Sequence, residues 1–78
     1  MSVKVTSNES FSSSRDTLRQ LVVDAGTGSA TLQAKAGATW ITVADGVITV
    51  DGITTFYAVS GQEFRVTIAG DAQAWLSG

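Results

Sequence analysis

Apolar and polar residues alternate with a period of two along much of the chain. Two runs show this most clearly, residues 29–35 and residues 63–69. Their apolar members are Ala30, Leu32 and Ala34 in the first run and Phe64, Val66 and Ile68 in the second. Successive side chains of a strand point to opposite faces of its sheet, so this period predicts strands with one dry face and one wet face. Arg65 and Thr67 are therefore expected to face outward.

Short turn signals divide the chain at fairly regular intervals. They are Gly26-Thr27-Gly28, Ala36-Gly37, Asp45-Gly46, Asp51-Gly52, Ser60-Gly61 and Gly70-Asp71. Gly and Asp are favoured in tight turns, and this spacing is typical of a sandwich or barrel. Residue usage agrees, because nine Val, four Ile and ten Thr against four Leu favour sheet over helix. We therefore predict an all-β fold, a small antiparallel β-sandwich or barrel of about seven short strands.

The turn signal at Asp45-Gly46 lies between two apolar runs, residues 40–43 and 47–50. An Asp-Gly pair readily supplies the positive φ angles of a two-residue hairpin turn. The pattern predicts a hairpin here, with positive φ at Gly46 and one strand on either side. Further strands are predicted over residues 53–59, 63–69 and 73–76.

The first seventeen residues differ in kind from the rest of the chain. Residues 3–6 alternate like a strand, whereas residues 7–14 are polar apart from Phe11. A tract without apolar periodicity cannot build a core, so it is expected to be an arm or loop. The sequence thus predicts an N-terminal strand and Ser-rich arm over residues 1–17 and a sandwich or barrel domain over residues 18–78.

The segment that follows the predicted arm fits two periods. Leu18, Leu21 and Val22 have the spacing of a helix face, whereas Leu18, Gln20 and Val22 suit one face of an edge strand. A strand is preferred, because the segment leads directly into the turn at Gly26.

The core of this chain is expected to be thin. A domain of 78 residues buries only roughly 60% of the surface that its unfolded chain exposes. Without Cys or His it has neither a disulfide nor a common structural zinc site. Oligomerisation or docking is then the expected source of extra stability, so we predict a homo-oligomer.

Charge and hydropathy argue against two classes of partner. Five basic and seven acidic residues give a net charge of −2, and no window holds the cluster of Lys and Arg that binding to phosphates requires. No apolar run is long enough to span a bilayer, and the polar N-terminus does not resemble a secretion signal. We expect a soluble protein that binds neither nucleic acid nor membrane.

The chain offers few groups for catalysis. There is no His to act as a base near neutral pH, and no Ser–His or Cys–His pair can form. The carboxylates to consider are Asp24, Asp45, Asp51, Glu63 and Asp71, and four of these lie at predicted turns. Asp is favoured there because its side chain hydrogen-bonds nearby backbone. We predict structural carboxylates, with no enzyme activity, no catalytic or cofactor-binding residues and no metal site.

The aromatic residues between positions 40 and 75 allow two interpretations. Trp40, Phe56, Tyr57 and Trp75 can fill a thin β core, or can form a platform for a sugar or a protein partner. A core position is favoured for Trp40. For Trp75 the two interpretations stay equal, because its side chain lies on the opposite face of its strand from both neighbours.

Three segments carry a resemblance to a known class of protein. They are Gly28-Ser29-Ala30-Thr31-Leu32-Gln33, Trp40-Ile41-Thr42-Val43 and the run FRVTIAGDAQAWL from Phe64 to Leu76. With them the chain resembles the small β-rich structural proteins of tailed bacteriophages, over roughly residues 20–78 and as a style of sequence. This class includes capsid decoration, or cement, proteins and head or tail fibre subunits. The resemblance implies a virion protein, made in the host cytoplasm, that binds a symmetric phage capsid or tail surface and assembles as a trimer.

Three functional hypotheses follow. The first is a non-enzymatic virion structural protein whose interface anchors are Phe11, Tyr57, Trp75 and Leu76. The alternative is a carbohydrate-binding β-module in which Trp40, Tyr57 or Trp75 stacks on a sugar ring, which would need exposed, coplanar rings. The third is an inhibitor or immunity-type protein whose acidic surface meets a basic target.

Overall fold

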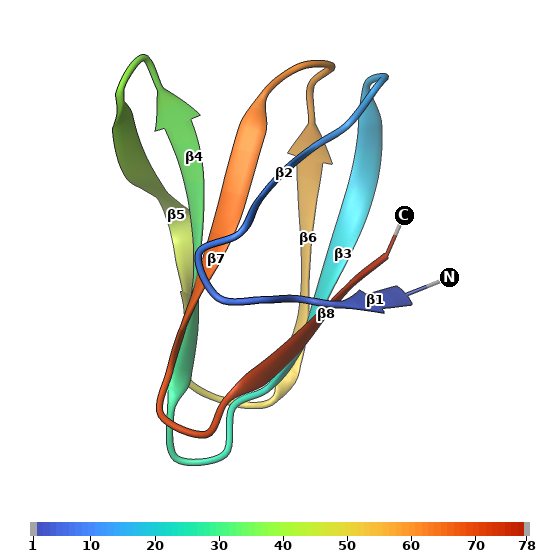
Figure 1. The fold of residues 1–78 in the computed structure, drawn as a ribbon. Coiled ribbons are helices and arrows are strands. Elements are labelled where there is room, and N and C mark those ends of the chain that lie inside the picture. Colours follow the sequence, from blue (N-terminus) through green and yellow to red (C-terminus); the bar gives the residue numbers. More distant parts are fainter. Residues whose placement is uncertain (1, 78) are drawn as a thin grey trace.

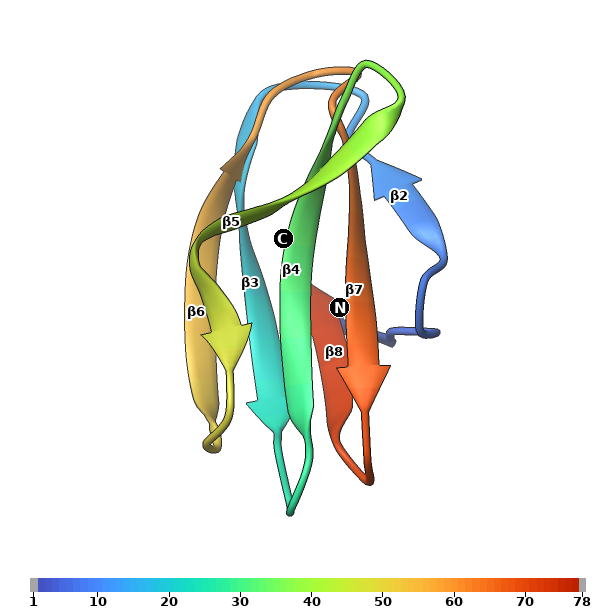
Figure 2. The same ribbon diagram turned by 90° about the vertical axis from the view of Figure 1, so that its left-hand side faces the viewer.

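Two four-stranded antiparallel sheets pack face to face as a β-sandwich (Figure 1, Figure 2). The structure is a computed structural model and describes residues 2–77. Sheet A has the strand order β1-β8-β3-β6, and sheet B has the order β2-β7-β4-β5. The strands are β1 (Ser2–Lys4), β2 (Ser10–Ser12), β3 (Thr17–Asp24), β4 (Ser29–Ala36), β5 (Thr39–Ile48), β6 (Gly52–Ala58), β7 (Glu63–Ala69) and β8 (Gln73–Ser77). The predicted all-β class is confirmed, with one strand more than expected.

The core lies between the sheets and is built from the alternating residues of the central strands. Leu21 from β3, Leu32 from β4 and Val66 from β7 are the largest side chains that are fully buried. The alternating apolar residues of β4 and β7 point into this core, as predicted. Several of the other buried residues are small, namely Ala25, Ala30, Ala58, Ala72 and Ala74. The core is therefore thin, because alanine contributes little apolar area.

The Ser-rich N-terminal segment is part of the sandwich and does not extend from it as an arm. It begins in sheet A, where β1 pairs with β8, and crosses to sheet B, where β2 pairs with β7 (Figure 1). Phe11, the middle residue of β2, packs against Phe56 and Phe64, with ring centroids 6.4 and 5.9 Å away. One apolar residue thus places an otherwise polar tract against the core.

Hydrogen bonds from polar residues hold this segment against β7. The Asn8 N–H donates to the Val66 carbonyl at 2.9 Å, and the Ile68 N–H donates to Ser7 Oγ at 2.9 Å. The Thr67 hydroxyl donates to Asn8 Oδ1 at 2.8 Å. Polar side chains act here as partners for a neighbouring strand, so the lack of apolar periodicity did not mean a lack of order.

The pair Asp45-Gly46 lies inside a single strand, so the predicted hairpin is wrong. β5 runs through this pair without a break. Its register against β4 shifts between Thr31 and Gln33, which marks a β-bulge in β5. The positive φ, 57°, occurs at Asp45 and not at Gly46. The Asp-Gly signal was real, but it bends a strand instead of ending it.

Gly46 is required at the bulge for space. A Cβ at this position would lie 2.7 Å from the carbonyl oxygen of Val43 and 2.8 Å from that of Leu32. Both are backbone atoms, which cannot rotate away as the end of a side chain can. Close approach of two backbone segments, rather than a left-handed conformation, therefore explains this glycine.

Carboxylates join the three turns at one end of the sandwich, the lower end in Figure 1. The Ala25 N–H, between β3 and β4, donates to Asp51 Oδ1 at 2.8 Å. The Thr27 N–H and hydroxyl donate to Asp71 Oδ1 at 2.8 and 3.1 Å. Asp51 and Asp71 are structural, as predicted for turn carboxylates, although each binds the backbone of a neighbouring turn and not its own.

Candidate binding surfaces

The four predicted interface anchors divide between the interior and one outer face. Leu76 is 8% exposed and belongs to the core, and Phe11 packs against that core. Tyr57 on β6 is 56% exposed, and Trp75 on β8 is half-buried. Both lie on the outer face of sheet A, because their neighbours along the strand point into the core. Only Tyr57 and Trp75 therefore remain available for contact with a partner.

The outer face of sheet A carries an apolar patch. Residues opposite each other in a ladder point to the same face, and the pairing aligns Trp75 with Val22 and Val22 with Ile53. Leu18 pairs with Tyr57 further along β3 and β6. These five residues, Leu18, Val22, Ile53, Tyr57 and Trp75, are called the sheet A patch below. Leu18 and Ile53 are 62% and 64% exposed, so the patch is open to solvent.

Charged residues lie only at the margin of this face. Lys4 pairs with Trp75 from the edge strand β1, and Asp24 is the last residue of β3. The uncharged polar pair Gln20 and Thr55 separates the pair Leu18 and Tyr57 from the rest of the patch. A partner that covers the centre of the patch therefore buries apolar area without removing a charge from water.

Sequence reasoning missed Leu18, Val22 and Ile53 as surface residues, because it assigned them only to strands. β6 shows the signal that could have revealed them. Ile53 and Tyr57 lie on one face of β6, whereas Phe56 and Ala58 lie on the other. A strand with apolar residues on both faces, placed in a sheet covered on one side only, must expose one of the two sets.

The outer face of sheet B is polar over β4 and β7, where side chains bind one another. Val47, at the β5 edge of this face, is apolar and 58% exposed. Arg65 Nε donates to Gln33 Oε1 at 2.8 Å, and Gln33 Nε2 donates to Thr42 Oγ1 at 3.4 Å. The Arg65 guanidinium lies over the Trp40 ring, with Cζ 4.5 Å from the ring centroid. Trp40 is on this outer face because the pairing of β5 with β4 aligns it with Lys35. The core position favoured for Trp40 is therefore wrong.

The aromatic rings on the outer faces of the two sheets do not form the flat platform that a stacked sugar requires. Arg65 covers one face of the Trp40 ring. Tyr57 and Trp75 share the outer face of sheet A, but they pair with β3 at Leu18 and at Val22. This register separates them by about 14 Å along the strands and about 10 Å across them. The carbohydrate-binding alternative therefore gains no support from the arrangement of these rings.

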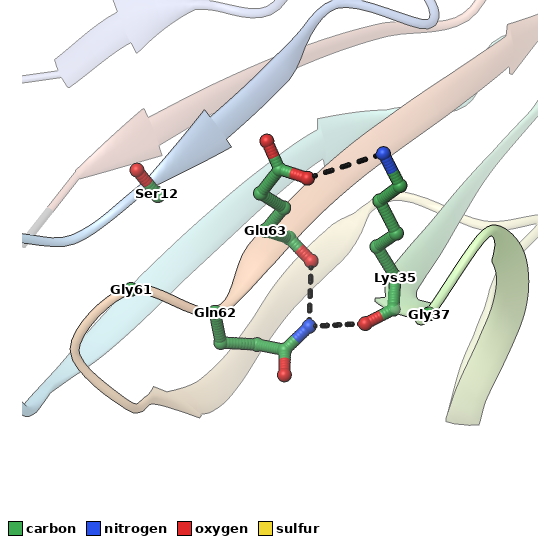
Figure 3. Close-up of a pocket in the computed structure, with 6 residues that line it drawn as sticks. All are labelled: Ser12, Lys35, Gly37, Gly61, Gln62 and Glu63. Carbon is green, nitrogen blue, oxygen red and sulfur yellow. Dashed lines mark hydrogen bonds and ion pairs between the residues drawn. The ribbon is translucent and has the colours of Figure 1, made fainter.

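A shallow hollow of about 350 Å³ opens at the other end of the sandwich (Figure 3). Its lining residues are Ser12, Lys35, Gly37, Gly61, Gln62 and Glu63. Lys35 Nζ and Glu63 Oε2 form an ion pair at 3.5 Å. Gln62 Nε2 donates to the carbonyl oxygens of Lys35 and Glu63 at 2.7 and 3.0 Å. These polar groups bind each other, and the hollow lacks the apolar walls of a typical ligand pocket.

The pKa of one carboxyl group is shifted, and the cause is structural. The Thr27 backbone N–H, followed by the Thr27 hydroxyl, holds the pKa of Asp71 below its ordinary value of 3.8. These are the hydrogen bonds that join two turns. Within residues 2–77, no three His, Cys, Asp or Glu side chains converge as ligands for a metal ion. The shifted pKa of Asp71 therefore reflects the hydrogen bonds that connect the two turns.

Arg19 points inward from β3 and lies against the cluster of aromatic rings formed by Phe11, Phe56 and Phe64. Its Nε is buried and makes no hydrogen bond within the described part of the chain. Its Cζ lies 5.6 Å from the centroid of the Phe11 ring, and the residue pairs with Phe56 across the ladder. Attraction between the cation and the ring offsets part of the cost of the unbonded donor. Arg19 therefore belongs to the packing of the sandwich and not to the sheet A patch.

Comparison of the chain with protein-family models, curated proteins and solved structures found no match. Residues 2–77 contain no helix that is long and apolar enough to cross a membrane. Of the surfaces described above, the sheet A patch has the composition best suited to contact with a protein.

Proposed function

We propose that this chain is a non-enzymatic virion structural protein, of the decoration or fibre type, which binds a symmetric capsid or tail surface. The sheet A patch is the observation that carries the proposal, because it presents exposed apolar side chains on a sheet with charges only at its margin. Burial of such a surface against a protein releases water without stranding a charge. The resemblance of residues 20–78 to phage structural proteins suggests the kind of partner.

In this proposal the patch binds by shape complementarity. Trp75 is the main anchor, because it lies beside Val22 in a row that crosses the sheet and because aromatic residues dominate the energy of protein interfaces. Tyr57 and Ile53, which lie in the edge strand β6, extend the contact to that edge of the sheet. A capsid or tail repeats the same site many times, so linked copies of the chain bind together more tightly than single copies.

The test uses phage particles that lack this protein. They are prepared from the cells that encode the chain, after its gene has been deleted. Purified protein is added back, and the particles are sedimented. We expect the protein to sediment with them and to saturate at a fixed ratio to one capsid or tail protein. Sedimentation no greater than that of an unrelated protein of similar size and charge would refute the proposal.

A further inference from the structure

Among the described strands, β6 is the edge strand that lacks protection against pairing with another chain. The edge strands β1 and β2 have three residues each, and the edge strand β5 contains the bulge at Asp45. Short strands and bulges are known protections against edge-to-edge pairing. β6 has seven residues, pairs with β3 without a register shift, and contains neither a charged residue nor Pro between Gly52 and Ala58.

We infer that two copies of this chain pair through β6, antiparallel, about a two-fold axis at Thr55. The inference goes beyond the proposed function and specifies a surface for the homo-oligomer that the thin core leads us to expect. Thr55 is the middle residue of β6, so this register uses the whole strand. It joins the two copies of sheet A into one continuous sheet of eight strands.

This register places compatible side chains opposite each other. Ile53 of one copy faces Tyr57 of the other on the outer face, and Gly52 faces Ala58. Pairs of a β-branched and an aromatic residue are favoured across antiparallel strands. Ile53 and Tyr57 are 64% and 56% exposed in the single chain, so both have apolar area to bury. Because β6 has no charged residue, the pairing brings no like charges together.

The surroundings of β6 favour a second copy as its partner. β5 lies on the same side of the sandwich as β6 (Figure 2), and its Ile41 and Val47 are 53% and 58% exposed. Pairing through β6 brings this side of each copy next to the other. A two-fold contact uses one surface twice, and β6 is complementary to itself in the register centred on Thr55. Because the core is thin and rich in alanine, apolar area buried between two copies would add to the stability of the chain.

A single cysteine tests the register directly, because the chain has no Cys of its own. At the two-fold axis residue 55 faces itself, and opposed Cα atoms in antiparallel strands are about 4.5–5.5 Å apart, within the range of a disulfide. We expect Thr55→Cys to form a disulfide-linked dimer under mild oxidation. The control is Thr42→Cys, an exposed position on the edge strand β5, which should stay largely monomeric.

A pair of charged variants gives a second, reversible measurement. Thr55→Lys and Thr55→Glu each place like charges at the axis, so each alone should lose the dimer in sedimentation. An equal mixture of the two should restore it as a heterodimer. Circular dichroism checks that both variants keep their β signal. Because Thr55 is exposed on the outer face, the fold should tolerate either charge.

Three results would overturn the inference: a wild-type monomer at all concentrations, a trimer, or disulfide formation no faster at residue 55 than at residue 42. A trimer would match the phage resemblance but not a two-fold axis. If Thr55→Lys abolished binding to particles while the free wild-type chain stayed monomeric, the partner of β6 would be a particle protein and not a second copy. The disulfide and sedimentation measurements on the free chain use no particles, so a dimer that fails to bind particles refutes the virion proposal alone.

Discussion

Gly28 and Gly46 both lie where a carbonyl oxygen leaves no room for a Cβ. At Gly28 a Cβ would lie 1.9 Å from the Ala69 carbonyl oxygen, where the turn before β4 meets the end of β7. At Gly46 it would meet two carbonyl oxygens at the bulge of β5. The packing of strands depends on these approaches as well as on apolar burial, because backbone atoms cannot move aside separately.

Replacement of Gly46 by Ala should therefore destabilise the fold. We expect Gly46→Ala to lower the free energy of unfolding by about 1–3 kcal/mol, the usual cost of overpacking. The larger Gly46→Val should cost at least as much, for the same steric reason. Gly52→Ala is the control, since a Cβ at Gly52 meets nothing within 4 Å. Urea denaturation compares the variants, and equal midpoints for Gly46→Ala and wild type would show that the bulge can relax.

Asp71 should make the folded chain less stable in acid. Hydrogen bonds from Thr27 hold its pKa below 3.8, so the unfolded chain takes up the proton at a higher pH than the folded chain. The stabilisation from this carboxylate is thus present above pH 3.8 and is lost as the pH falls through the folded pKa. We expect Asp71→Asn to be less stable than wild type at neutral pH and equal to it in strong acid.

Urea midpoints measured from neutral to acidic pH test this prediction. Asp24→Asn is a suitable control, because Asp24 is exposed and its side chain makes no hydrogen bond within residues 2–77. The loss of stability at neutral pH is expected for Asp71→Asn and not for Asp24→Asn, because only Asp71 joins two turns. A constant difference between Asp71→Asn and wild type across the same pH range would contradict the role given to the Thr27 contact.

At the scale of elements, the short strand β2 attaches the N-terminal segment to sheet B. Its three residues pair with β7, and hydrogen bonds from Ser7 and Asn8 extend the attachment. Phe11 is its only apolar residue and packs on Phe56 and Phe64. A strand with a single apolar side chain should detach when that side chain is removed, while the rest of sheet B keeps its own pairing.

Phe11→Ala should consequently release the N-terminal segment. We expect a loss of about 3 kcal/mol in stability, at the low end for a phenylalanine because Phe11 is only partly buried. In the wild-type chain, trypsin should cut at Arg15 slowly. In the variant, cleavage there should be faster than cleavage at Arg65 in β7. Rapid cleavage at Arg15 in the wild-type chain would instead restore the picture of a free arm.

For the whole molecule, the two outer faces differ in what they offer to a partner. The outer face of sheet A carries an apolar patch with charged residues only at its margin, whereas that of sheet B carries a polar network around Arg65. A polar network whose members already bind each other gains little from a new partner. Binding to a particle should therefore depend on sheet A, and tryptophans on the two faces allow a matched comparison.

Trp75→Ala is expected to leave a folded chain that binds particles poorly. Trp75 is half-buried on the outer face, so its removal leaves the core intact. We expect binding to weaken by about 2–4 kcal/mol, as for aromatic anchors of other interfaces. Trp40→Ala, on the face of sheet B, is the control and should bind like wild type. Loss of β signal in Trp75→Ala would assign this residue to the core, and equal binding by both variants would exclude the sheet A patch.

The sequence by itself determined the local features of this protein. Alternation placed Leu32 and Val66 inward, since period two has the same meaning in any sheet. Five of the six predicted turn signals lie between two strands, because glycine adopts without strain the positive φ that Gly26, Gly61 and Gly70 have there. Absence of His and Cys was also readable directly.

Only the tertiary structure decided the features that depend on a neighbour. Asp45-Gly46 became a bulge because β4 continues beside it, and the polar tract around Phe11 became a strand because β7 offers it partners. The side of each sheet that faces solvent likewise depends on which strands pair, so Trp40 and Ile53 lie on outer faces for a reason outside their own segments. Periodicity gives the two faces of a strand, but packing of the second sheet selects which face is buried.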